Sequence, residues 1–99
     1  MRLEFHAAAF GELQSAAEYY ESRETGLGVR FLDMVDESLE RIARDPTAWS
    51  AVDEDVRRCL TRVFPFGVFY TIEPQFILIL AVAHLAREPG YWASRTKKL

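Results

Sequence analysis

The stretch HLAREPGYW at residues 84–92 places a histidine, an arginine, a tyrosine and a tryptophan directly behind an apolar run. The imidazole of His84 titrates near neutral pH, so it can act as a general acid or base. A histidine that directly follows an apolar strand more often closes the strand end with a hydrogen bond. The stretch is therefore a candidate catalytic cluster, a candidate partner surface, or the folded-back end of a small domain.

Two arginines upstream have the spacing of an anion-binding pair. Arg58 and Arg62 are four residues apart, and an extended strand would place both side chains on the same face. There they could bind two anionic groups, although a solvated strand face is an equally good interpretation. Arg57 would point to the opposite face, where we expect it to pair with a carboxylate of a helix.

The end of the chain combines a turn signal with a basic tail. Proline and glycine at residues 89–90 favour a turn that would fold Tyr91 and Trp92 back onto the sheet. We expect Trp92 to pack on a sheet face that no helix covers. For Tyr91, a packing role and a functional role are about equally well supported. The tail is expected to be mobile unless a partner orders it, and its basic residues are Arg95, Lys97 and Lys98.

No metal or cofactor site is visible in the sequence. His6, His84 and Cys59 do not form a cluster with metal-ligand spacing, and His6 is expected to cap or pack at the start of a helix. Neither a glycine-rich phosphate loop nor a Ser-His-Asp set is present. We therefore expect no metal and no cofactor.

Size and composition predict one globular domain spanning residues 1–99. Hydrophobic residues make up 49% of the chain, which is ample for a single core. The longest apolar run, residues 76–83, is far shorter than the ~20 residues that span a bilayer. The lone Cys59 cannot form an intramolecular disulfide, which fits a reducing compartment. We expect a soluble cytoplasmic protein with no membrane partner.

The net charge of -3 hides an asymmetry between the two halves of the chain. Residues 1–55 contain 13 acidic and 5 basic side chains, whereas residues 56–99 contain 2 acidic and 7 basic ones. The second half can therefore attract an anionic partner although the whole protein is acidic. The simpler interpretation is that the acidic residues only solvate two helices.

Hydrophobic spacing predicts an α+β fold. Apolar residues at spacings of three and four indicate two helices, and β-rich runs separated by short turns indicate strands. The helices should form an antiparallel hairpin on one face of a mostly antiparallel sheet, with Trp49 holding the connection to the fold. The expected elements are a strand at 2–5, helices at 7–24 and 27–44, strands at 56–64, 68–73 and 76–84, and a tail at 85–99.

Three stretches in this order resemble the RelE/ParE superfamily of bacterial toxins. They are GLGVRFLDMVDESLERI, RRCLTRVFPFGVFYTIE and ILILAVAHLAREPGYWASR, and the resemblance covers nearly the whole chain. It implies the RelE/ParE-like fold and the toxin role in a type II toxin-antitoxin system, closer to the ParE-like members. Such a toxin arrests growth, takes part in stress responses, and is held inactive in a hetero-oligomer by a cognate antitoxin.

The resemblance leaves the cellular target open, because the superfamily contains ribosome-dependent messenger-RNA endonucleases and also non-nucleolytic poisons of DNA gyrase. A nuclease needs an acid, a base and cations at the phosphate. By this resemblance, cationic positions of the nucleases fall on Leu60, Gly67 and Leu85 here. Losing one such group typically costs about 2.7–4 kcal/mol of transition-state stabilisation. The residues that would serve a nuclease are Arg58, Arg62, His84, Arg87 and Tyr91.

The favoured hypothesis is therefore a non-enzymatic, ParE-like toxin with DNA gyrase as the candidate target. The alternatives are a RelE-type endonuclease acting on the ribosome with its messenger RNA, and a degenerate toxin that only binds an antitoxin. The antitoxin should lay an amphipathic helix against a groove between the hairpin and the sheet edge. Candidate partner-binding residues are Phe10, Leu13, Tyr20, Arg58, Arg62, Arg87, Tyr91, Trp92 and Arg95.

Overall fold

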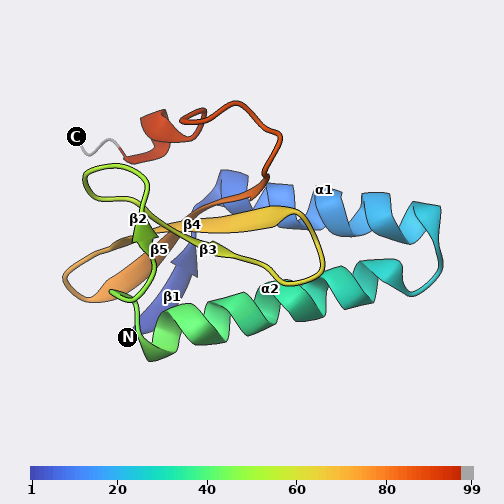
Figure 1. Ribbon diagram of the computed structural model, residues 1–99, viewed down its shortest axis with the longest axis horizontal. Coiled ribbons are helices and arrows are strands. Elements are labelled where there is room, and N and C mark those ends of the chain that lie inside the picture. Colours follow the sequence, from blue (N-terminus) through green and yellow to red (C-terminus); the bar gives the residue numbers. More distant parts are fainter. Residues whose placement is uncertain (97–99) are drawn as a thin grey trace.

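The computed structural model describes residues 1–96 and contains two long helices and five strands (Figure 1). A short 3-10 helix, η1, follows the last strand. Residues 97–99 lie outside the described part of the chain, and so do Lys97 and Lys98 of the expected basic tail. The elements are β1 (Arg2–Phe5), α1 (Ala7–Arg23), α2 (Leu27–Arg44), β2 (Ser50–Ala51), β3 (Arg57–Leu60), β4 (Phe66–Ile72), β5 (Phe76–His84) and η1 (Ala93–Thr96).

The five strands form one sheet in the order β1-β5-β4-β3-β2. Strand β1 is parallel to β5, and the other neighbours are antiparallel. The parallel pairing follows from the chain order, since the helical hairpin carries the chain across before the meander begins. The predicted α+β architecture, with the helices on a mostly antiparallel sheet, is confirmed.

The bounds of two predicted strands need correction, and a third short strand was not predicted. The strand expected at 56–64 ends at Leu60, because the backbone N–H of Thr61 donates to the carbonyl of Phe66 and its hydroxyl donates to the carbonyl of Phe64. These bonds close the turn early, so β4 begins at Phe66 instead of residue 68. Strand β2 was not expected, since it has only two residues and is defined by its pairing with β3.

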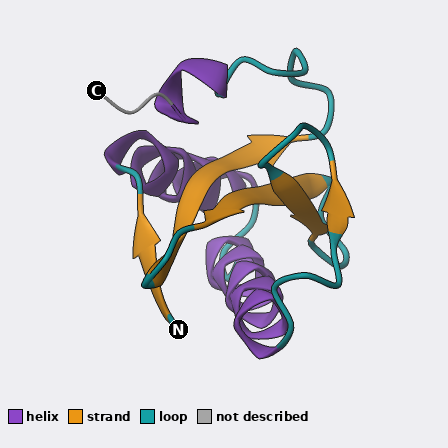
Figure 2. Cartoon of the chain, turned by 90° about the vertical axis from the view of Figure 1, so that its left-hand side faces the viewer, coloured by secondary structure: helices purple, strands orange, loops and turns teal. Residues whose placement is uncertain are grey.

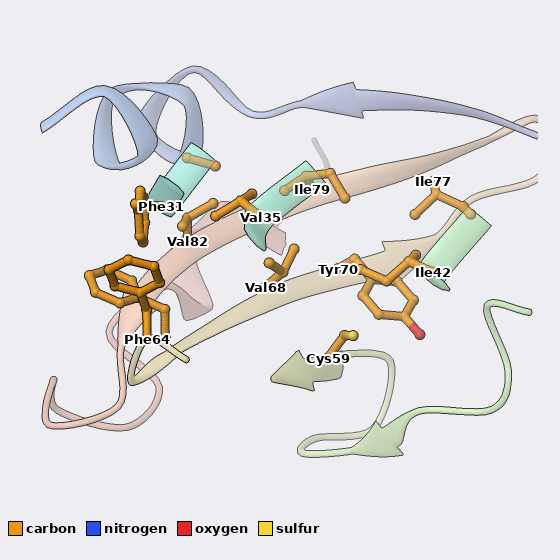
Figure 3. Packing of buried hydrophobic residues seen from close by; sticks show 12 residues of the cluster. Phe31, Val35, Ile42, Cys59, Phe64, Val68, Tyr70, Ile77, Ile79 and Val82 are labelled. Atoms are coloured by element: carbon orange, nitrogen blue, oxygen red, sulfur yellow. The ribbon is translucent and has the colours of Figure 1, made fainter. Parts of the chain in front are cut away.

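The sheet has an apolar core on each face. On one face, side chains of α2 meet those of β4 and β5, as Figure 3 shows for Val35, Val68 and Ile79. We call this the helix-side core. The C-terminal segment lies on the side of the sheet opposite α2 (Figure 2). There the tail-side core consists of Val56, Phe69, Leu80, Ala81, Ala83 and Trp92.

Trp92 is the residue that closes the tail-side core. It is only 5% exposed, and its ring centroid lies 5.4 Å from that of Phe69 on β4. The expected packing of Trp92 on the face without helices is therefore confirmed. The sheet is buried on both sides, which explains why β5 reads as an almost continuous apolar run.

Polar contacts fix the ends of the helices and their connection to the sheet. His6 caps α1, because its Nδ1 accepts from the backbone N–H of Ala8 at 3.0 Å. Trp49 anchors the connection, as its Nε1 donates to the carbonyl of Arg41 at 3.4 Å. Arg57 does not pair with a helix carboxylate, as was expected; its guanidinium donates to the backbone carbonyls of Thr47 and Trp49. Among residues 1–96, no helix is both long and apolar enough to cross a membrane.

The two helices are in close contact at Gly28. A Cβ atom there would lie 2.6 Å from the carbonyl oxygen of Ala17 on α1. The carboxylate of Glu21 accepts from the backbone N–H groups of Gly26 and Gly28, so α1 supplies the cap of α2. Gly26 has φ +90°, a left-handed conformation that glycine adopts without strain. The glycines therefore set the angle of the hairpin.

We expect Gly28→Ala to lower the free energy of unfolding by about 1–3 kcal/mol, because the methyl group must displace backbone atoms of α1. Gly11→Ala is the matched control, since Gly11 is exposed in the middle of α1 with open space around it. That change should raise the free energy of unfolding by about 0.5–1 kcal/mol. Urea titrations followed by circular dichroism measure both, and equal effects of the two substitutions would contradict the close contact.

Candidate functional site

Five of the predicted site residues, including Trp92, line one groove on the tail side of the sheet. The groove has a volume of about 320 Å³. Its walls include Arg58 of β3, His84 at the end of β5, and Arg87 and Tyr91 of the C-terminal segment. We call it the tail groove; its full lining is Val52, Asp53, Arg58, Phe69, residues 83–85 and residues 87–92.

Arg58 owes its position to Gly67. The two residues lie on neighbouring strands, and a Cβ atom at Gly67 would come within 3.1 Å of the Arg58 Cγ and of a ring carbon of Phe69. The missing side chain leaves the space in which the aliphatic part of Arg58 lies. Within residues 1–96, Arg58 forms no ion pair, so its positive charge is available to a ligand of the groove.

Arg62 does not join Arg58, which corrects the expected pair of arginines on one strand face. The strand ends at Leu60, and the turn that follows carries Arg62 toward the helices. Its Nη1 lies 3.3 Å from a carboxylate oxygen of Glu37 on α2. The tail groove therefore receives only one cation from this part of the chain.

His84 has the structural role that the simpler interpretation predicted. It is exposed at the end of β5, and its Nδ1 accepts from the backbone N–H of Ala86 at 3.0 Å. Its ring centroid lies 5.3 Å from that of Phe66. This hydrogen bond stabilises the turn after β5, where the chain leaves the strand and begins to line the groove.

Glu12 organises the groove, and the sequence analysis did not identify it. Its carboxylate accepts from the backbone N–H of Val82 at 3.1 Å and from the Tyr91 hydroxyl at 2.7 Å. Arg95 donates to both carboxylate oxygens at 3.0 Å. One side chain of α1 thus ties the helix to β5 and to the C-terminal segment. Local spacing gave no signal for it, because Tyr91 and Arg95 lie 79 and 83 residues later in the chain.

Arg95 is held in place, which corrects the expectation that it belongs to a mobile tail. Its side chain is 16% exposed, and besides Glu12 it donates to the carbonyl of Leu80 at 3.0 Å. The tail is thereby fixed as far as η1. Arg95 is consequently a structural contact of this fold, and Arg87 is the more exposed cation, with 54% of its side chain accessible.

Glu12 and Arg95 form hydrogen bonds with backbone groups of β5 that have no partner on β1. Strand β1 ends at Phe5, opposite Ile79. Farther along β5, the N–H of Val82 donates to Glu12 and the carbonyl of Leu80 accepts from Arg95. Buried backbone groups need such partners, because an unpaired one costs about as much as a lost hydrogen bond. The two side chains therefore replace a missing neighbouring strand.

The contacts within this cluster keep the Glu12 carboxylate ionised and the Tyr91 hydroxyl protonated at neutral pH. Burial raises the pKa of Glu12, but hydrogen bonds from Arg95, Tyr91 and Val82 outweigh this effect, so the pKa is lowered overall. Burial, together with the hydrogen bond to Glu12, raises the pKa of Tyr91 to about 12. The Tyr91 hydroxyl therefore stays protonated at neutral pH and is a poor general base.

Arg87 lies against Tyr91 on the side of the groove. Its guanidinium carbon is 3.9 Å from the centroid of the Tyr91 ring, and its Nη1 is 3.9 Å from Glu12. Stacking on an aromatic ring orients a guanidinium while leaving its N–H groups available. Arg87 and Arg58 are thus the arginines of the groove, whose lining also includes the aromatic rings of Phe69 and Trp92.

The apolar residues proposed for partner binding on α1 differ in accessibility. Leu13 packs against the helix-side core, and the Tyr20 ring lies 5.3 Å from Phe31 and 4.8 Å from Phe64. These two side chains fill the space expected to be an open groove. Phe10 remains 49% exposed, with its ring edge-on to Phe5.

No metal centre can be assembled from the part of the chain that the structure describes. Within residues 1–96, no group of three or more histidine, cysteine, aspartate or glutamate side chains could hold an ion. Cys59 lies in the helix-side core, and burial raises the pKa of its thiol. The lining of the groove combines arginines and aromatic rings with the carboxylates of Asp53 and Glu88.

We expect Glu12→Gln to destabilise the protein by about 1–3 kcal/mol at pH 7, because it removes the charge that holds Arg95. The folded-state pKa of Glu12 is lowered, so its contribution is present above its ordinary value of 4.5 and is lost as the pH falls below that value. The gap between parent and variant should therefore shrink toward pH 3. Urea titrations across this range measure the gap. Glu18→Gln, at an exposed position of α1, should show no such gap, and a pH-independent effect at Glu12 would contradict the assignment.

The comparisons with known proteins agree with this structure. A family model described as "ParE toxin of type II toxin-antitoxin system, parDE" matches residues 3–89. A solved structure described as the chromosomal ParDE TA system from P. aeruginosa has a TM-score of 0.72 and 16% identity, and the match covers 85% of this chain and 95% of that chain. This structural likeness supports the fold. No curated protein matches the chain significantly in sequence.

The family match runs from β1 through the Arg87 region and so includes both helices, the whole sheet and much of the tail groove. The chain therefore belongs to the ParE toxin family of type II toxin-antitoxin systems.

Proposed function

We propose that this protein is a growth-inhibiting toxin that acts by binding its target and not by cutting nucleic acid, with DNA gyrase as the target. The state of Tyr91 carries this proposal. Its hydroxyl donates to Glu12 and its pKa is raised to about 12, so it does not serve as a base at neutral pH. Arg62 points to α2, and the Nδ1 of His84 already accepts a backbone hydrogen bond.

The tail groove has the composition of a binding surface. Arg58 and Arg87 supply positive charge, while Phe69 and Trp92 supply apolar area close to the sheet. Arginine and aromatic residues are enriched where protein interfaces gain most of their energy. These residues support recognition of a macromolecule that offers both acidic and apolar groups.

The antitoxin is the second partner in this proposal, and both partners meet the toxin in the cytoplasm. Strand β1 lies at the edge of the sheet and pairs only with β5, so an extended segment of the antitoxin can add to its free side. The exposed Phe10 on the neighbouring α1 offers an apolar contact for an amphipathic helix. We propose a toxin-antitoxin hetero-oligomer in which the toxin is inactive.

One observation favours a nuclease as the second candidate. Arg58, His84, Arg87 and Tyr91 do line a single groove, as a phosphate-cleaving site would require. A ribosome-bound RNA that displaced the Glu12 contact could free the Tyr91 hydroxyl. The two functions differ in the lesion they leave in the cell, so they can be separated by experiment.

We expect induction of the protein without antitoxin to arrest bacterial growth, to trap gyrase on cleaved DNA, and to leave messenger RNA intact. Arg87→Ala and Arg58→Ala should each weaken growth inhibition at least about tenfold, which corresponds to about 1.4 kcal/mol of target affinity. Arg30→Ala, at an exposed position of α2, should keep full toxicity. Gyrase assays, growth curves and sequencing of RNA ends provide the readouts.

Three results would contradict the proposed function and favour another one. RNA breaks within translated codons, abolished by Tyr91→Phe, would establish the endonuclease instead. Growth arrest with neither DNA nor RNA damage would exclude gyrase as the poisoned target. Harmless expression at high level, together with tight antitoxin binding, would identify a module that only binds antitoxin.

A further inference from the structure

Val63 has a backbone conformation that valine rarely adopts. Its φ angle is +73°, in the left-handed region, and among residues 1–96 it is the only residue other than glycine with a positive φ. A β-branched side chain is strained there, since its Cβ crowds the following carbonyl group. The side chain is also 75% exposed, so burial in the core does not compensate for the strain. Strained positions of this kind cluster at functional sites.

The loop around Val63 is held rigidly by its neighbours. The Thr61 hydroxyl donates to the carbonyls of Phe64 and Phe66, and the N–H of Phe66 donates to the carbonyl of Phe64. Phe64 itself is 7% exposed, and its ring lies 5.3 Å from that of Phe31 in the helix-side core. Phe64 is thus buried while the preceding Val63 is exposed. Both lie in the loop that joins β3 and β4, drawn in yellow in Figure 1.

Val63 shares its end of the sheet with two other exposed apolar residues. Leu60, at the end of β3, is 44% exposed, and Leu85, just after β5, is 46% exposed. Leu85 is tied to the loop, because its N–H donates to the carbonyl of Pro65 at 2.9 Å. We call Leu60, Val63 and Leu85 the apolar knuckle. Leu85 also lines the tail groove, so the knuckle and the groove form one continuous surface.

We propose that the apolar knuckle docks the toxin onto its protein target, with Val63 inserted into an apolar pocket bordered by carboxylates. Two arginines lie beside it: Arg62 on the same loop, which is 64% exposed although it pairs with Glu37, and Arg58 in the adjoining groove, which forms no ion pair among residues 1–96. An aliphatic side chain gains nothing from contact with phosphate, which favours a protein surface over nucleic acid. The rigid loop reduces the entropy lost on binding.

This inference rests on the proposed function, since it assigns the knuckle to the target and not to the antitoxin. Continuity with the tail groove supports that assignment. The antitoxin surface proposed above, at the free side of β1 and Phe10, involves other elements. A toxin with an altered knuckle should therefore remain a normal ligand of its antitoxin.

The test compares Val63→Gly and Val63→Asn with the parent chain and with Val63→Ile. Glycine and asparagine both adopt positive φ readily, so the melting temperature should stay the same or rise. Growth inhibition and inhibition of purified gyrase should nevertheless fall at least about tenfold. Val63→Ile keeps the apolar branch and should retain inhibition. Val29→Ala, at a 60% exposed position of α2, is the control for losing an exposed valine.

Each outcome bears directly on the inference. Full growth inhibition by Val63→Gly and Val63→Asn would overturn the docking role while leaving the toxin function standing. Weakened antitoxin binding with unchanged toxicity would move the knuckle to the antitoxin and also overturn it. A lower melting temperature for both variants would remove the strain on which the inference depends. If the parent chain itself is harmless, the proposed function fails, and the docking role fails with it.

Discussion

The carboxylate of Glu12 is the interaction on which the C-terminal half of this structure depends. It joins three segments that are distant in the sequence: helix α1, the far end of β5, and the segment that carries Tyr91 and Arg95. Its side chain is 17% exposed, so solvent screens the pairing with Arg95 less than it would at the surface. Removing Glu12 would leave the nearly buried guanidinium of Arg95 without its carboxylate partner.

The short length of β1 makes this interaction necessary. Because β1 stops opposite Ile79, the next backbone groups of β5 on that side have no neighbouring strand. Glu12 and Arg95 bond these groups, and in doing so they place the tail over the sheet. Trp92 can then cover Phe69 and complete the tail-side core. The tail groove is a consequence of satisfying one sheet edge.

The same contacts decide which charges remain available to a partner. Acidic residues from the N-terminal half neutralise basic residues of the C-terminal half, as Glu37 does for Arg62 and Glu12 does for Arg95. The asymmetry of charge along the chain therefore becomes internal pairing in the fold. The groove keeps Arg58 and the half-exposed Arg87 for a partner.

The sequence alone determined the elements, because hydrophobic periodicity and turn residues act over a few neighbouring positions. It predicted both helices, the α+β fold with a mostly antiparallel sheet, the capping by His6, and the packing of Trp92. It could not locate β2, which exists only through its pairing with β3. It also misplaced Arg62, since the turn after Leu60 depends on hydrogen bonds from Thr61.

Only the tertiary structure decided the site. Glu12 lies 79 positions before Tyr91 and 83 before Arg95, and nothing local in the sequence distinguishes it from the other acidic residues of α1. The left-handed conformation of Val63 is likewise imposed by the burial of Phe64 and by the bonds that close the loop. Pairing between distant charges and strain at single residues arise when the chain packs. The spacing of residue types along the sequence therefore cannot predict either of them.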